Sequence, residues 1–252
     1  MITILTPTYN RAYRLPALYE SLMKQHGSFE WLIVDDGSFD NTRSWVESIK
    51  EYSPFKIRYI YQENQGKHIA LNTGISQALG DWIFIVDSDD YLCDHALEIM
   101  TKDIVQYGDE YELCYRKTLV TGQMVGAYID EAKIVMSTTQ ASHVLKGDLA
   151  YLFKTSSLRQ FPFPYISTEK FVPELYIWNK ISDCSQILFF PKKSIYFCEY
   201  LEDGYSKQFK EHLRKNPLGF LVFYRDQLRR EHSLMQKVKC IIRIIQCIIH
   251  LK

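Results

Sequence analysis

The sequence predicts an α/β fold built on a mostly parallel central sheet. Over the first 90 residues, short apolar runs alternate with amphipathic segments, and the connections between them are short. Four of the apolar runs have the length of buried strands, and a polar cluster directly follows each of them. Strands joined by helices form parallel sheets with right-handed crossovers, so these polar clusters should meet at one edge.

The first two predicted strands are residues 2–6 and 31–34. The first is followed by the loop Thr6-Pro7-Thr8-Tyr9-Asn10-Arg11 and then by a helix with apolar residues at helical spacing up to Met23. The second is followed by Asp35, Asp36 and a glycine turn, after which a second helix is expected. Either aspartate could bind a ligand or only form this turn.

The third predicted strand, residues 57–61, precedes the segment Glu63-Asn64-Gln65-Gly66-Lys67-His68 and a helix that stops at Gly80. The fourth, residues 82–86, is followed by Asp87, Asp89 and Asp90. Three carboxylates this close would repel one another in a dry site, and a bound divalent cation is the usual relief. An acidic turn that caps the next helix is the alternative, which stays open for Asp90.

The alternation is weaker after residue 95. Residues 112–119 and 125–129 are expected to be strands, and residues 147–158 to be a helix. Another helix should follow Glu174, then short strands at 187–190 and 194–199, and helices from about residue 207. We therefore divide the chain into a domain of residues 1–206, with halves 1–95 and 96–206, and a helical C-terminal extension of residues 207–252.

Composition narrows the functional classes. The 252 residues contain 30 basic and 30 acidic residues, so the whole-molecule charge gives no reason to expect a nucleic-acid partner. Six scattered cysteines without a C-x-x-C pair indicate reduced thiols rather than a zinc site or disulfides. With no signal peptide and no transmembrane run, we expect a cytoplasmic protein, at most peripheral on the inner face of the membrane.

Four motifs, in order, resemble those of family-2 glycosyltransferases with the A-type nucleotide-diphosphosugar transferase fold. They are the Thr6–Arg11 loop and the segments 34–42, 64–74 and 80–90. The resemblance implies a GT-A type fold with a Rossmann-like N-terminal half. It also implies an inverting, metal-dependent transferase that moves a sugar from a nucleotide donor, expected to be a UDP-sugar, to a hydroxyl of a saccharide acceptor. Beyond residue 100 the resemblance is thinner.

Matching the motifs residue by residue assigns roles to individual side chains. Asp87-Ser88-Asp89 matches the family's D-x-D, which implies Asp89 as direct ligand of Mn²⁺ or Mg²⁺, with Asp87 near the ribose or bound through water. The residues implied in donor binding, Asp87 included, are Thr6, Pro7, Thr8, Tyr9, Arg11, Asp35, Asp36, Lys67, His68, Asp87 and Ser88. Lys67 opens a helix, where a cation and backbone N–H groups suit a diphosphate.

An inverting transfer needs a general base for the acceptor hydroxyl. Glu174 stands four residues before Trp178, like the acid of the family's Glu-Asp motif, although Leu175 replaces the usual aspartate. Glu169 competes for this role, and each could instead be a salt-bridged surface acid. Ser206 and Lys207 are candidates for a loop over the diphosphate.

Residues 234–252 predict a helix with one apolar and one basic face. Such a helix can lie in a membrane interface, pack on its own domain, or form a homodimer. Membrane contact would fit a polyprenyl-diphosphate-linked saccharide acceptor in bacterial cell-surface polysaccharide synthesis. Two rival functions remain: a non-catalytic sugar-nucleotide-binding or scaffold protein, and a nucleotidyltransferase on a similar sheet. The lack of a Gly-rich phosphate loop argues against the latter.

Overall fold

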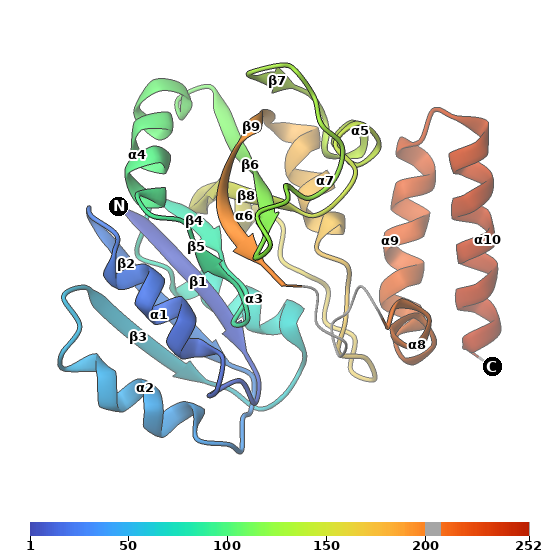
Figure 1. Cartoon of the computed structure of the whole chain (residues 1–252). Coiled ribbons are helices and arrows are strands. Elements are labelled where there is room, and N and C mark those ends of the chain that lie inside the picture. The colour runs from blue at the N-terminus through green and yellow to red at the C-terminus, as the bar shows by residue number, and fades with distance from the viewer. Residues whose placement is uncertain (200–207, 252) are drawn as a thin grey trace.

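The computed structural model describes residues 1–199 and 208–251. Within these residues, nine strands form one mixed sheet in the order β3-β2-β1-β4-β8-β6-β9-β5, with β7 paired to β9 (Figure 1). The first four strands, β1 (Ile2–Thr8), β2 (Phe29–Asp35), β3 (Lys56–Tyr61) and β4 (Trp82–Ile85), all pair in parallel. The predicted α/β fold is confirmed, and these four strands end at a common edge.

Helices cover both faces of this parallel half. Alternate residues of β1 and β2 point to opposite faces, so that Ile4 and Trp31 pack with α1 (Leu15–Met23) and α2 (Thr42–Lys50). Leu5 and Leu32 face the other side and pack with α3 (Lys67–Gln77). This last helix ends at Gln77, three residues before the predicted end.

The second half extends the sheet. Its elements are β5 (Tyr91–Leu92), α4 (Ala96–Tyr107), β6 (Tyr111–Leu119), β7 (Ile134–Val135), α5 (Thr138–Val144), β8 (Leu149–Lys154), α6 (Thr155–Gln160), α7 (Leu175–Cys184) and β9 (Gln186–Cys198). β8 runs antiparallel between β4 and β6, and β6 pairs in parallel with β9. The C-terminal end of β6 therefore lies at the same edge as that of β4.

Three predictions for this half were wrong. Residues 147–158 contain β8 and α6 instead of one helix. The strand was missed because β8 packs apolar residues against both faces of the sheet, so that its sequence lacks the apolar–polar alternation of a half-buried strand. Residues 125–129 form no strand, since the Arg116 guanidinium bonds to the carbonyls of Val125 and Ala127. The two short strands predicted between residues 187 and 199 are one strand, β9, with irregular register.

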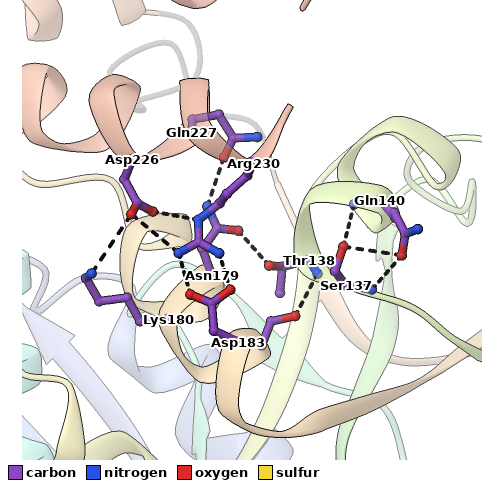
Figure 2. A network of polar contacts seen from close by, with 10 residues as sticks. Ser137, Thr138, Gln140, Asn179, Lys180, Asp183, Asp226, Gln227 and Arg230 are labelled. Carbon is purple, nitrogen blue, oxygen red and sulfur yellow. Dashed lines mark hydrogen bonds and ion pairs between the residues drawn. The ribbon is translucent and has the colours of Figure 1, made fainter. Parts of the chain in front are cut away.

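The C-terminal part folds into α8 (Phe209–Lys215), α9 (Pro217–Arg230) and α10 (Leu234–His250). α9 packs on α7 through a polar network that also reaches α5 (Figure 2). At its centre, the fully buried Asn179 accepts a hydrogen bond from Thr138 Oγ1 at 2.6 Å and donates one to Gln227 Oε1 at 2.8 Å. Beside it, Arg230 pairs with Asp183 and Asp226. A buried network in which each amide is satisfied holds two helices in one relative position.

Two further properties concern the described residues as a whole. All six cysteines carry free thiols. Among residues 1–199 and 208–251, no helix combines the length and the apolar character that crossing a bilayer requires.

Candidate active site

A cleft of about 640 Å³ opens at the edge of the sheet where β1, β2, β4 and β6 end. Ten of the residues predicted for the site line it: Pro7, Thr8, Tyr9, Arg11, Asp36, Lys67, Asp87, Ser88, Asp89 and Glu174. The polar clusters that follow separate strands thus converge, as parallel strands require.

One wall of the cleft is formed by the loops after β1 and β2. The buried Thr8 hydroxyl has no hydrogen-bond partner among residues 1–199 and 208–251. Tyr9 lies half-exposed, edge-on to Phe39 with 6.2 Å between ring centroids. An unsatisfied hydroxyl beside an exposed aromatic pair suits a nucleoside, which has both a flat base and polar atoms.

The Asp36 carboxylate organises the loop that leads into α3. It accepts hydrogen bonds from Gln62 Nε2 at 2.7 Å and from the N–H groups of Gln65 and Gly66 at 2.9 and 2.7 Å. Burial raises the pKa of Asp36 above its ordinary value, although these donors oppose the shift. Gly66, with φ +95°, then passes so close to Lys170 that a Cβ would lie 2.0 Å from the Lys170 carbonyl oxygen. Only glycine fits there, and the turn directs the next residue into the cleft.

Lys67 joins the two walls of the cleft. Its Nζ lies 2.6 Å from Asp87 Oδ1 and 2.7 Å from Glu174 Oε1. Burial lowers the pKa of Lys67, but the two carboxylates outweigh it and hold the pKa well above its ordinary value. Burial raises the pKa of Asp87, yet attraction to Lys67 leaves it below the ordinary value. The Lys67 ammonium thus bridges Asp87 and Glu174, the candidate base.

The carboxylates after β4 are crowded. Burial raises the pKa of Asp89, and the charge of Asp87 raises it further. Burial likewise raises the pKa of Asp90 to about 7, with Lys117 opposing the shift. Carboxylate oxygens in a buried, mutually repulsive group match the ligand preference of Mg²⁺ and Mn²⁺.

Among the described residues, however, no three His, Cys, Asp or Glu side chains are grouped as a ready-made metal site. Mg²⁺ commonly binds to one or two carboxylates together with substrate phosphates. Asp87 and Asp89 therefore fit a cation that arrives with a diphosphate better than one held by protein alone.

Residues from the second half complete the cleft, and sequence reasoning did not assign them. Lys117, at the end of β6, places Nζ 3.8 Å from Asp90 Oδ2 and 4.1 Å from the centre of the Tyr196 ring. The Tyr196 hydroxyl also accepts a hydrogen bond at 3.0 Å from the N–H of Asp87. Asp148 lines the same side. The sequence signal that could have identified these residues was weak, because each is only a polar residue near the end of a strand and belongs to no family motif.

Two predicted donor-binding residues lie behind the cleft instead of in it. Thr6 is fully buried, and its hydroxyl accepts a hydrogen bond from the Trp31 indole at 3.0 Å. Asp35 is fully buried and accepts from the Tyr59 hydroxyl at 2.5 Å and from the N–H of Ser38 at 2.7 Å. Both side chains fix the loops that carry the lining residues.

His68 and Glu169 are likewise absent from the lining of the cleft. His68 is buried edge-on against Phe163, and burial lowers its pKa to about 4. Glu169 is 6% exposed, and its two oxygens accept hydrogen bonds from the N–H groups of Leu218 and Gly219, each at 2.7 Å. A carboxylate at the N-terminus of α9 is a helix cap. Ser206 and Lys207 lie outside the described residues.

The sequence is similar to those of known glycosyltransferases. The profile of Glycosyl transferase family 2 matches residues 3–148. An uncharacterized glycosyltransferase of Nostoc sp. is 31% identical over 160 residues, which are 62% of this chain and 49% of that protein. The UDP-Glc:alpha-D-GlcNAc-diphosphoundecaprenol beta-1,3-glucosyltransferase WfgD of Escherichia coli is 26% identical over 183 residues, 72% of this chain and 69% of that protein. The chain thus spans about half the length of the Nostoc relative.

Solved structures share the fold. S. aureus TarS in complex with UDP aligns with a TM-score of 0.67 at 21% identity, covering 98% of this chain and 70% of that one. The mannosyltransferase PcManGT of Pyrobaculum calidifontis, in complex with GDP-Man and Mn²⁺, aligns with a TM-score of 0.64 at 17% identity, covering 99% and 73%. The family profile covers more than half of the chain, and the sheet and the converging motifs agree with it. The chain therefore belongs to glycosyl transferase family 2.

Proposed function

We propose that the chain transfers a sugar from a UDP-sugar to a hydroxyl of a saccharide acceptor, with inversion and with a divalent cation. The observation that carries this proposal is the bridge Asp87–Lys67–Glu174, in which one ammonium ion contacts a D-x-D carboxylate and a candidate base. Separate walls of the cleft thereby bring a leaving-group site and a proton acceptor close together.

The donor side follows from the first wall. Tyr9 and Phe39 would contact the base, and the free Thr8 hydroxyl would hydrogen-bond to the nucleoside. Asp87 and Asp89 would hold the cation, which when bound neutralises charge on the diphosphate. Two similar proteins support UDP as the nucleotide of the donor. The name of WfgD specifies UDP-Glc, and TarS was crystallised with UDP.

The acceptor side follows from Glu174. Of the two candidate bases, Glu174 lines the cleft, whereas both oxygens of Glu169 are occupied by the cap of α9. In the proposed step, the acceptor oxygen attacks the anomeric carbon while its proton passes to the Glu174 carboxylate. The bond from the anomeric carbon to the diphosphate breaks, and its electron pair leaves with the diphosphate oxygen. Lys67 would move from Glu174 towards that oxygen.

The acceptor is proposed to be a saccharide linked to a polyprenyl diphosphate, at the inner face of a membrane. The name of WfgD, which specifies a diphosphoundecaprenol-linked acceptor, supports this class. Synthesis of a cell-surface polysaccharide is the process in which such a transfer would serve.

Thermal shift with UDP, GDP, CDP and dTDP, each with and without Mn²⁺, tests the donor site. A ligand at about 100 times its dissociation constant stabilises the fold by about 2.7 kcal/mol. We expect the largest shift for UDP with Mn²⁺, and its loss in Asp89→Asn. The control is Asp130→Asn, because Asp130 is exposed and does not line the cleft. A larger, metal-independent response to another nucleotide would contradict both the donor and the metal assignment.

A further inference from the structure

The helix α10 leaves a broad apolar surface uncovered. Eight of its apolar side chains are at least 43% exposed: Leu234, Met235, Val238 and the five exposed isoleucines between residues 241 and 249. At about 100° per residue they share one arc of about 140°, without a polar residue inside it. We call this surface the α10 stripe.

The opposite side of α10 is already used for folding. Cys247 is buried with Phe220 and Leu221 of α9, and Ile244 packs beside them. α9 is in turn held to α7 by the Asn179 network (Figure 2). The stripe is therefore presented outward by a helix whose position is fixed, on the side of the molecule away from α2 and α4 (Figure 1).

The C-terminal helices carry an excess of positive charge. Residues 208–251 contain nine Lys and Arg against three Asp and Glu, a net charge of +6 in a chain whose total is zero. On α10 itself the charged residues are Lys237, Lys239 and Arg243, with no acid. By helical spacing, Lys237 and Lys239 lie within about 40° of the two edges of the arc. Arg243 lies on the far side of α10, with Cζ 4.7 Å from the centre of the Phe209 ring.

We propose that the α10 stripe binds the surface of a membrane that contains anionic lipid. An apolar face with basic flanks inserts into the interface while its cations meet the lipid phosphates. A second copy of this chain fits less well, because a two-fold contact places a patch against itself. In such a contact, α10 offers no acid that could pair with the cations of the other copy.

Membrane binding by the α10 stripe would place the cleft near a lipid-linked acceptor. This part of the inference rests on the proposed function. A groove of about 250 Å³ lies beside the cleft, and Ser142 and Leu175 line both. Its charged lining residues are Lys239, Arg243 and Glu231, so that cations outnumber acids there. A membrane held against α10 would bring a lipid-linked acceptor to the Glu174 side of the cleft. Its diphosphate would pass the two cations of the groove.

Sedimentation with vesicles tests the proposal on the whole chain. We expect binding to vesicles of phosphatidylcholine with phosphatidylglycerol, and much weaker binding to phosphatidylcholine alone. The double substitution Ile241→Asn and Ile245→Asn should lower binding about 30-fold or more, since two apolar side chains no longer leave water. Lys237→Gln should lower it about fivefold, on the anionic vesicles only.

The matched control is Val105→Asn on α4, where a side chain of similar chemistry is 84% exposed far from α10. It should bind vesicles like the parent protein. Because the substituted isoleucines are about half-exposed, we expect the double variant to fold and to keep its thermal shift with UDP and Mn²⁺.

Three outcomes would overturn the proposal: no binding of the parent to anionic vesicles, equal binding of the double variant, or a dimer that the double substitution converts to monomer. The last would assign the stripe to a second copy. Vesicle binding without any response to nucleotides would leave the docking surface intact and count against the proposed function alone.

Discussion

The two walls of the cleft are held in different ways. The wall from residues 1–95 carries its side chains on loops directly after parallel strands, and Asp35, Asp36 and Thr6 tie those loops down over short distances. The wall from the second half comes from β6, the segment before α7 and the start of β8. Its position depends on distant partners such as the N-terminus of α9 and the Asn179 network. The first wall is thus held by hydrogen bonds between residues 3 to 30 positions apart, and the second by hydrogen bonds between residues 41 to 49 positions apart.

Glu169 and Glu174 illustrate how distant contacts determine the second wall. They lie five residues apart in one segment, and the sequence offers both as the base. One faces the cleft beside Lys67, and the other caps a helix that begins almost fifty residues later. Which acid faces the cleft is decided by where α9 docks, and no local sequence pattern carries that information.

The largest effect on transfer activity is expected when the second wall loses its candidate base. Glu174→Gln should lower transfer by about 10²- to 10⁴-fold, because an amide cannot accept the acceptor's proton. Donor affinity should change little, since Asp87, Asp89 and Tyr9 are untouched. Release of the nucleoside diphosphate with acceptor present, alongside thermal shift with UDP and Mn²⁺, measures the two separately. Full transfer activity in this variant would exclude Glu174 as the base.

The next effect concerns the contact between the walls. Gly66→Ala should destabilise the fold by about 3 kcal/mol, since φ is positive and the new Cβ would overlap the Lys170 carbonyl. The matched control is Gly122→Ala, where φ is +89° but no atom lies within 4 Å. It should cost about 1 kcal/mol, for backbone strain alone. Chemical denaturation gives both values, and equal costs would show that the walls do not meet as described.

The smallest effect is expected at Glu169, and it distinguishes a structural from a catalytic role for this acid. Glu169→Gln should destabilise by about 1–2 kcal/mol, because an amide caps the N-terminus of α9 through one oxygen and without charge. Transfer by the folded variant should stay within a few-fold of the parent. Glu131→Gln, at an exposed position, provides the baseline. A loss of transfer as large as in Glu174→Gln, at unchanged stability, would exchange the roles of the two acids.

The sequence alone was enough for the parallel half of the fold and for the convergence of most proposed donor-binding residues on one cleft. Hydrophobic period placed the first four strands, and parallel strands that end at one edge must bring their following residues together. It was also enough for the amphipathic pattern of α10, because a helix of 3.6 residues per turn separates apolar and basic residues by spacing alone.

Tertiary structure decided the rest. It turned Thr6, Asp35 and His68 away from the cleft, because neighbouring residues on a strand or helix face different ways and the sequence motif does not say which face is solvent. It brought Lys117 and Asp148 to the carboxylates through the pairing of β8 between β4 and β6. It also left the outer face of α10 open while burying the opposite side. Each of these outcomes depends on contacts between residues far apart in the chain, which local spacing does not encode.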